Sequence, residues 1–167
     1  MTITVVIGLA VLGPWSIPVI AAARVDASSC RLPNRIVLPG LAVTLALAAA
    51  VAAARTDVGP FVRACVGASL MALTFLLAHL FRPNGLGFGD VKYGALIGAG
   101  LGALTPVLVL LAYVLAVPAH AAALRWRWWP AQRQAHAPCG VAPFGPALAL
   151  GAALALLIVF VIHLAGS

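Results

Sequence analysis

Residues 61–80 read FVRACVGASLMALTFLLAHL, a run in which Arg63 is the one residue with a formal charge. A helix of about 20 mostly apolar residues is long enough to cross the hydrocarbon core of a bilayer. Further apolar segments are found around this run. They occupy residues 3–23, 36–54, 91–103, 105–123 and 144–164. We therefore predict an all-α, polytopic membrane bundle of about six transmembrane helices, formed by residues 1–167 as a single domain.

The composition supports a membrane location. The chain is 64% hydrophobic and 8% charged, and its mean hydropathy is +1.14, values outside the range of soluble globular proteins. Its formal charge of +7 could indicate nucleic-acid binding, but the basic residues lie singly or in short clusters between the apolar segments. That distribution is typical of membrane topology, so we expect a lipid bilayer as partner and no nucleic acid.

The fourth and fifth segments are separated because turn-forming residues lie between them. Gly102 begins a turn-like stretch and Pro106 follows it, which favours two helices over one long tilted helix, the alternative at this point. Gly94, Gly98 and Gly102 recur every four residues and place small side chains on one helix face. The spacing predicts a close packing seam against a neighbouring helix.

Basic residues are concentrated in three connections. The first, third and fifth connections hold eight of the ten, and the second holds Arg55 and Arg63. The eight are Arg24, Arg31, Arg35, Arg82, Lys92, Arg125, Arg127 and Arg133. Because cytoplasmic loops carry the Lys and Arg excess, we expect these three connections on the cytoplasmic side and both chain ends outside. We also expect residues 1–23 to remain as the first helix, because they lack the basic stretch that opens a signal peptide.

The chain holds three carboxylates, Asp26, Asp57 and Asp90, and no Glu. Ionisable groups near a bilayer cost several kcal/mol unless they are paired or hydrated, so those present tend to be functional. Asp57 lies between Arg55 and Arg63 in the outer connection, where a surface role explains it. Asp26 and Asp90 border the first and third connections, which we expect on the same side of the membrane. We therefore expect these two side chains to meet.

Two facing aspartates share one proton and titrate as a pair. One can accept a proton from a water that attacks a peptide carbonyl, while its protonated partner polarises that carbonyl. This chemistry predicts Asp26 and Asp90 as catalytic residues of a peptidase without cofactor or metal. The three Cys and four His are scattered, without zinc-ligand spacing. A structural or proton-carrying role for the pair is the alternative from the residues alone.

Asp90 ends the glycine-rich stretch GLGFGD at residues 85–90 and is followed by Val91 and Lys92. Glycines before the aspartate allow backbone conformations closed to other residues and let another chain approach closely. A dinucleotide-binding loop also contains spaced glycines, but here no predicted strand precedes them and no acidic residue follows about 20 positions on. The stretch therefore does not predict a nucleotide site.

With these motifs the chain resembles the type IV prepilin peptidases, which belong with the GxGD intramembrane aspartic proteases. Three motifs, in family order, carry the resemblance and span most of the chain. The matching residues are Gly87, Gly89, Asp90 and Lys92 for GxGD-V-K, Asp26, Pro33 and Asn34 for the first aspartate with its Pro-Asn signature, and Pro143, Gly145 and Pro146 for the P-F-G-P segment. The resemblance implies that Asp26 and Asp90 are the catalytic pair.

The resemblance also implies a substrate class and a location. The substrates are prepilins or pseudopilins, cut after a basic leader at the cytoplasmic face of the bacterial inner membrane. Larger members of the family carry an insert with CxxC motifs and methylate the new amino terminus. This chain has no CxxC and looks like the short, peptidase-only form of tight-adherence or Flp-type pili, so methyl transfer is not expected.

Supporting roles and two other functions complete the expectations. Lys92 is expected to pair with a carboxylate, to contact substrate or to extend to the headgroups, and Pro33 and Asn34 to shape the loop after Asp26. The rival functions are a small proton-coupled transporter and a non-catalytic subunit of a pilus or secretion assembly. A proton relay would need ionisable groups at the midplane or on both sides of the membrane.

Overall fold

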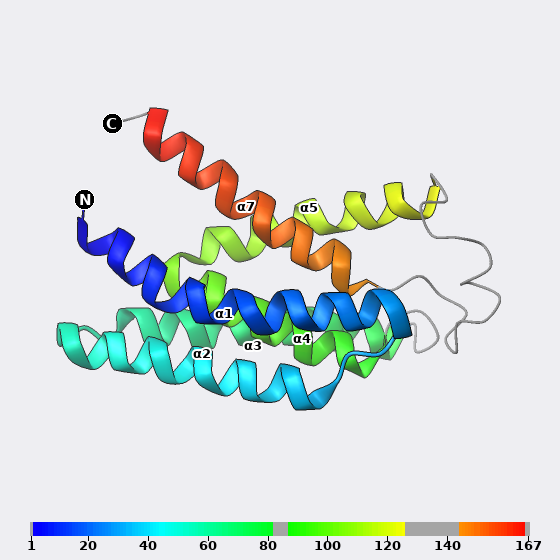
Figure 1. Cartoon of the computed structure of the whole chain (residues 1–167), viewed down its shortest axis with the longest axis horizontal. Coiled ribbons are helices and arrows are strands. Elements are labelled where there is room, and N and C mark those ends of the chain that lie inside the picture. Colours follow the sequence, from blue (N-terminus) through cyan, green and yellow to red (C-terminus); the bar gives the residue numbers. More distant parts are fainter. Residues whose placement is uncertain (1, 82–86, 126–143, 166–167) are drawn as a thin grey trace.

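The computed structural model describes residues 2–81, 87–125 and 144–165, and these residues form six helices and no strand. Figure 1 shows α5 and α7 together on one side of the other four helices. The helices are α1 (Thr2–Ser29), α2 (Asn34–Arg55), α3 (Gly59–Phe81), α4 (Phe88–Leu104), α5 (Pro106–Arg125) and α7 (Gly145–Ala165). The all-α prediction is confirmed, and α4 and α5 are separate helices that meet at Thr105.

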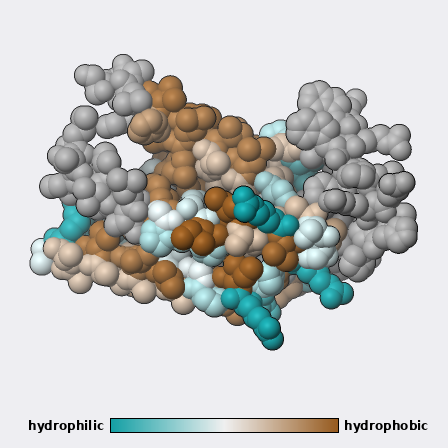
Figure 2. All heavy atoms as spheres, viewed as in Figure 1, coloured by the Kyte–Doolittle hydropathy of each residue, from teal (hydrophilic) through white to brown (hydrophobic). Residues whose placement is uncertain are grey.

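Three helices are long and apolar enough to cross a membrane: α2, α3 and α7 over Gly145–Ile162, while α5 offers a shorter apolar stretch, Pro106–Ala122. Large apolar side chains are exposed along α7, and Figure 2 shows hydrophobic side chains gathered along it. Exposed apolar side chains of this kind are suited to contact with lipid. The chain is therefore a helical membrane protein.

The short helix α4 lies at the centre of the bundle. Its residues from Tyr93 to Ala103 are all buried, and it contacts α1, α2, α3, α5 and α7. Because every side of α4 is buried, none of its faces needs to be polar. Its sequence is therefore apolar all round and shows no amphipathic pattern.

The predicted glycine seam is confirmed, and it joins α4 to α3. A Cβ atom at Gly98 would overlap the carbonyl oxygen of Gly67, and one at Gly67 would overlap that of Gly98. Gly102 lies against the backbone of Arg63, and Gly94 lies under the ring of Phe75. Because no side chain separates the two backbones where Gly67 meets Gly98 and Gly102, α3 and α4 approach closely there.

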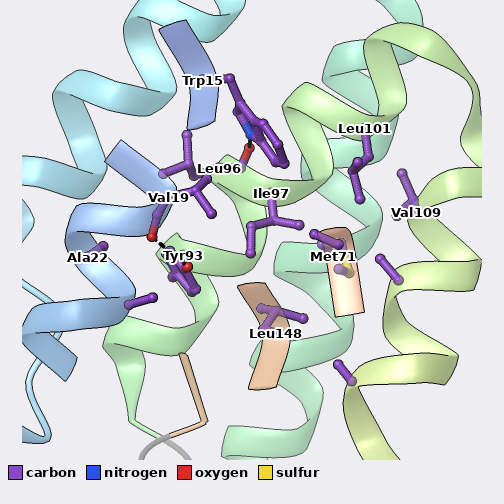
Figure 3. Close-up of a cluster of buried hydrophobic side chains, with 14 of the residues drawn as sticks. Trp15, Val19, Ala22, Met71, Tyr93, Leu96, Ile97, Leu101, Val109 and Leu148 are labelled. Atoms are coloured by element: carbon purple, nitrogen blue, oxygen red, sulfur yellow. Dashed lines mark hydrogen bonds between the residues drawn. The ribbon is translucent and has the colours of Figure 1, made fainter. Parts of the chain in front are cut away.

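Two hydrogen bonds set the register between α1 and α4. The indole N–H of Trp15 donates to the carbonyl oxygen of Leu96 at 2.9 Å, and the hydroxyl of Tyr93 donates to that of Val19 at 2.9 Å. Figure 3 shows both side chains in the space between the helices. The helices run antiparallel, so the carboxyl end of α1 and the amino end of α4 lie at the same end of the bundle.

The boundaries of α1 and α4 differ from those expected. The apolar segments 3–23 and 91–103, whose bounds are approximate to within several residues, stop next to the charged residues Arg24 and Asp90. Helical hydrogen bonding continues past those charges, so α1 extends to Ser29 and α4 begins at Phe88. Cys30 then ends α1 with a φ of 52°, and its N–H donates to the carbonyl oxygen of Asp26 at 2.8 Å.

Candidate active site

Asp26 lies in the last turns of α1, and its side chain is 4% exposed. Its Oδ2 accepts a hydrogen bond from the backbone N–H of Gly145, the first residue of α7, at 3.0 Å. A carboxylate that loses its water is stabilised by such a donor, and the amino end of a helix carries a positive partial charge. The end of α1 and the start of α7 therefore meet at this carboxyl group.

Asp90 lies in the first turn of α4 and caps the helix. Its Oδ2 accepts the backbone N–H of Gly87 at 2.9 Å, while its own N–H donates to the carbonyl oxygen of Gly87 at 3.0 Å. The reciprocal pair satisfies two groups at the helix start that would otherwise lack partners. The carboxyl group of Asp90 is thus held by its own helix, close to the motif glycines.

The two carboxyl groups are close enough to affect one another, and both lie outside the apolar spans 3–23 and 91–103. Burial raises the pKa of Asp26, and the hydrogen bond from Gly145 acts in the opposite direction. Burial, and then the negative charge of Asp26, raise the pKa of Asp90 to about 6, against the lowering effects of Gly87 and His79. A negative charge on Asp26 therefore favours the protonated form of Asp90.

The motif glycines provide space for close contacts. A Cβ atom at Gly89 would lie 3.0 Å from the Cβ atom of Leu32, in the segment that follows Asp26. Gly87 has an ordinary extended conformation, with φ −77° and ψ 152°. The expectation of close approach is confirmed at Gly89, and Gly87 does not use the backbone freedom that glycine allows. The packing of Leu32 on Gly89 brings the two aspartate-bearing segments together.

Lys92 links the same two segments at the surface. Its ammonium group donates to Oδ1 of Asn34, at the start of α2, at 3.0 Å. The same nitrogen lies 5.1 Å from the ring centroid of Phe88, a distance typical of a cation–π contact. The carbonyl oxygen of Pro33 accepts the N–H groups of Ile36 and Val37, so this proline opens α2.

The P-F-G-P segment opens α7, with Gly145 and Pro146 in the first turn, while Pro143 lies outside the described residues. The ring of Phe144 packs edge-on against two rings, His120 at 4.8 Å and Phe75 at 5.6 Å between centroids. These contacts come from α5 and α3. The start of α7 is therefore anchored by apolar packing as well as by its bond to Asp26.

Sequence reasoning gave His79 no role, yet this residue is close to the site. Its ring lies 6.1 Å from that of Phe88, and its charge affects the pKa of Asp90. The sequence feature that could have identified His79 is its position near the end of the apolar segment that leads to the GxGD motif. Asp57 lies apart, in the α2–α3 connection, where its side chain accepts the N–H of Gly59 at 2.8 Å. Its local turn role agrees with the expected surface function.

The carboxyl groups of this site are able to accept and donate protons. Among the described residues, no group of three or more His, Cys, Asp or Glu side chains has the arrangement of a metal site. Two coupled carboxyl groups, one ionised and one protonated, can activate a water and polarise a carbonyl group. The chemistry that this geometry supports is hydrolysis of an amide by an aspartate pair.

Comparison with known proteins places the chain among peptidases. A family model described as the type IV leader peptidase family matches residues 14–121, about two thirds of the chain. The matched region contains both aspartates, the Pro-Asn signature and the GxGD motif, and it ends before the P-F-G-P segment. No curated protein and no solved structure matches the chain.

Proposed function

The chain belongs to the type IV leader peptidase family, and we propose that it is an aspartic endopeptidase that removes the leader of prepilin or pseudopilin substrates. Membership makes it a membrane peptidase with protein substrates. The aspartic mechanism and the substrate are the proposal. One arrangement supports the mechanism: the segments that bear Asp26 and Asp90, 64 residues apart, pack together where Leu32 lies on Gly89 and where Tyr93 bonds to Val19. The negative charge of Asp26 then acts on the carboxyl group of Asp90.

The hydrolysis follows the chemistry of a proton-sharing pair. The ionised carboxylate accepts a proton from a water molecule while the water oxygen attacks the scissile carbonyl carbon, and the protonated partner gives its proton to the carbonyl oxygen. The resulting gem-diol collapses as the C–N bond breaks. The leaving nitrogen takes the proton that came from the water, and the partner regains its proton from a gem-diol hydroxyl. The pair returns to its starting state.

We propose that the site faces the cytoplasm of a bacterial cell, at the inner membrane. Support comes from the basic residues at this end of the bundle, including Arg24, Arg31 and Arg35 around the α1–α2 connection. A substrate with an apolar helix could approach through the bilayer and present its leader junction at the membrane surface. Both aspartates lie at this end, an arrangement that suits surface hydrolysis better than a proton relay across the membrane.

The test is co-expression with a Flp-type prepilin in a host that lacks its own prepilin peptidase. Leader removal is followed for the wild type and for Asp26→Asn, Asp90→Asn and Asp57→Asn, with membrane levels of each measured by immunoblot. We expect cleavage by the wild type and by Asp57→Asn, and no cleavage by the other two. Cleavage that survives Asp26→Asn or Asp90→Asn would refute the mechanism. Absence of cleavage by the wild type across several prepilins would refute the substrate class.

A further inference from the structure

The two carboxyl groups of the site are held in different ways. Asp90 is partly buried, and it receives its hydrogen bond from Gly87, the residue before its own helix, at an exposed position. Asp26 receives its bond from Gly145, 119 residues along the chain, and that bond is buried. A hydrogen bond to a carboxylate is electrostatically stronger where water is excluded. The buried donor therefore discriminates between the ionised and neutral forms more strongly than the exposed one.

The contact requires glycine at position 145. A Cβ atom there would lie 2.7 Å from Oδ2 of Asp26 and 3.3 Å from its Cβ atom. The second distance matters, because the Cβ atom of Asp26 is fixed by the helix and cannot swing away as a flexible chain end could. The next residue, Pro146, has no N–H and is tolerated in the first turn of a helix. Gly145 is therefore a specific donor that no larger residue can replace without displacing the carboxyl group.

The position of Gly145 is set by packing that does not involve Asp26. Phe144 is held between the rings of Phe75 and His120, and Leu148, one turn into α7, is fully buried in the core. The donor is thus fixed in place before the carboxylate is formed. A fixed dipole directed at a charge stabilises that charge without reorganisation during the reaction.

We propose that Gly145 is a positioning residue that holds Asp26 as the ionised member of the pair, so that Asp26 is the base that activates water and Asp90 is the acid. This assignment of roles rests on the proposed aspartic mechanism. Once Asp26 carries the negative charge, Asp90 lies in its field and retains the shared proton. Other titratable groups near the pair are Tyr93 on α4, His79 on α3, which acts on Asp90, and His120 on α5, which stacks on Phe144.

The test compares two glycine-to-alanine variants of α7. Gly145→Ala displaces the donor from Asp26, whereas Gly151→Ala introduces a comparable clash, with the carbonyl oxygen of Ala112 on α5, away from the site. The readout is the pH profile of kcat/KM for a prepilin-derived peptide with the full-length protein in detergent micelles. The acid limb of that profile reports the ionisation of the base in the free enzyme.

Loss of the bond disfavours the carboxylate, so Gly145→Ala should move the acid limb to higher pH by roughly one unit. The alkaline limb should stay in place. Gly151→Ala should keep both limbs where they are in the wild type, even if its maximal rate falls. Movement of the alkaline limb alone, or a loss of rate without movement, would overturn the assignment of Asp26 as the base.

A second pair of variants covers the case in which Gly145→Ala does not accumulate. Phe144→Leu weakens the anchor of α7 without adding volume at the carboxyl group, and should shift the acid limb in the same direction by less. Phe160→Leu makes the same change at an exposed position of α7 and should not shift it. An unshifted acid limb in Phe144→Leu would count against the proposal. None of these outcomes tests the aspartic mechanism itself, which fails only if Asp26→Asn or Asp90→Asn retains cleavage.

Discussion

The α3–α4 seam and the aspartate end of the bundle are built on opposite principles. At the seam, consecutive helices meet over several turns through glycine backbones, with Gly67 against Gly98 at its closest point. At the aspartate end, α1 and α7 meet through the buried hydrogen bond from Gly145 to Asp26, and α4 meets the segment after α1 where Leu32 packs on Gly89. The seam can therefore provide stability, and the aspartate end can provide chemistry at little gain in stability. Substitutions in the two regions should separate these properties.

The largest expected effect is the loss of activity in Asp26→Asn without a loss of stability. Removal of one member of a catalytic unit lowers the rate by about 10³-fold or more. The buried carboxyl group of Asp26 has a raised pKa, so its ionised form is disfavoured by folding, and the neutral amide removes that penalty at neutral pH. The thermal midpoint in detergent should stay level or rise. A fall of several degrees would show that the aspartate end also stabilises the fold.

The converse substitution is Gly98→Ala at the seam. Its added methyl group would meet the backbone of Gly67, so the helices must separate, which costs about 1–3 kcal/mol. At roughly 2–4 °C per kcal/mol, the thermal midpoint should fall by about 2–12 °C.

Gly13→Ala is the matched control for the seam, because a Cβ atom at Gly13 in α1 has no atom within 4 Å. Alanine is favoured over glycine in a helix interior by about 1 kcal/mol, so this variant should be neutral or more stable. Equal losses of thermal stability in Gly98→Ala and Gly13→Ala would show that close packing at the seam is not what stabilises the bundle.

Much of the fold could be predicted from the sequence, because membrane helices and glycine seams depend on local composition. The site was predicted less completely. Asp26 and Asp90 could be chosen because the chain has so few carboxylates, but their partners could not. The bond from Gly145 joins residues 119 positions apart, and the effect of His79 on Asp90 depends on how α3 packs. Such contacts follow from tertiary structure and leave no periodic pattern. The catalytic roles and the cytoplasmic orientation stay predictions.

The next-largest expected effect is a dependence of the free energy of unfolding on pH, which originates at the aspartate end. The pKa of Asp90 is raised from 3.8 to about 6 in the folded protein, so the folded state binds the proton more tightly than the unfolded state. The contribution of Asp90 to stability should therefore be largest below pH 3.8 and be lost, by on the order of 2–3 kcal/mol, as the pH rises through about 6. Asp90→Asn should reduce this decrease, and Asp57→Asn should not. A thermal midpoint that rises across this interval would contradict the sign.

The smallest effect is expected at the link between Lys92 and Asn34, which joins the two aspartate-bearing segments from outside. Its hydrogen bond is exposed, so water competes for both groups and the coupling should be about 0.5–1 kcal/mol. A double-mutant cycle of Lys92→Met and Asn34→Ala, followed by thermal unfolding and by cleavage rate, isolates that coupling.

We expect the cleavage rates of the single variants to fall severalfold and the double variant to add little further loss. Additive losses would mean that the residues act separately, for example with Lys92 contacting substrate. Coupling in the cleavage rate with almost none in the thermal midpoint would sharpen the contrast with the seam, since this contact would then align the site without stabilising the bundle.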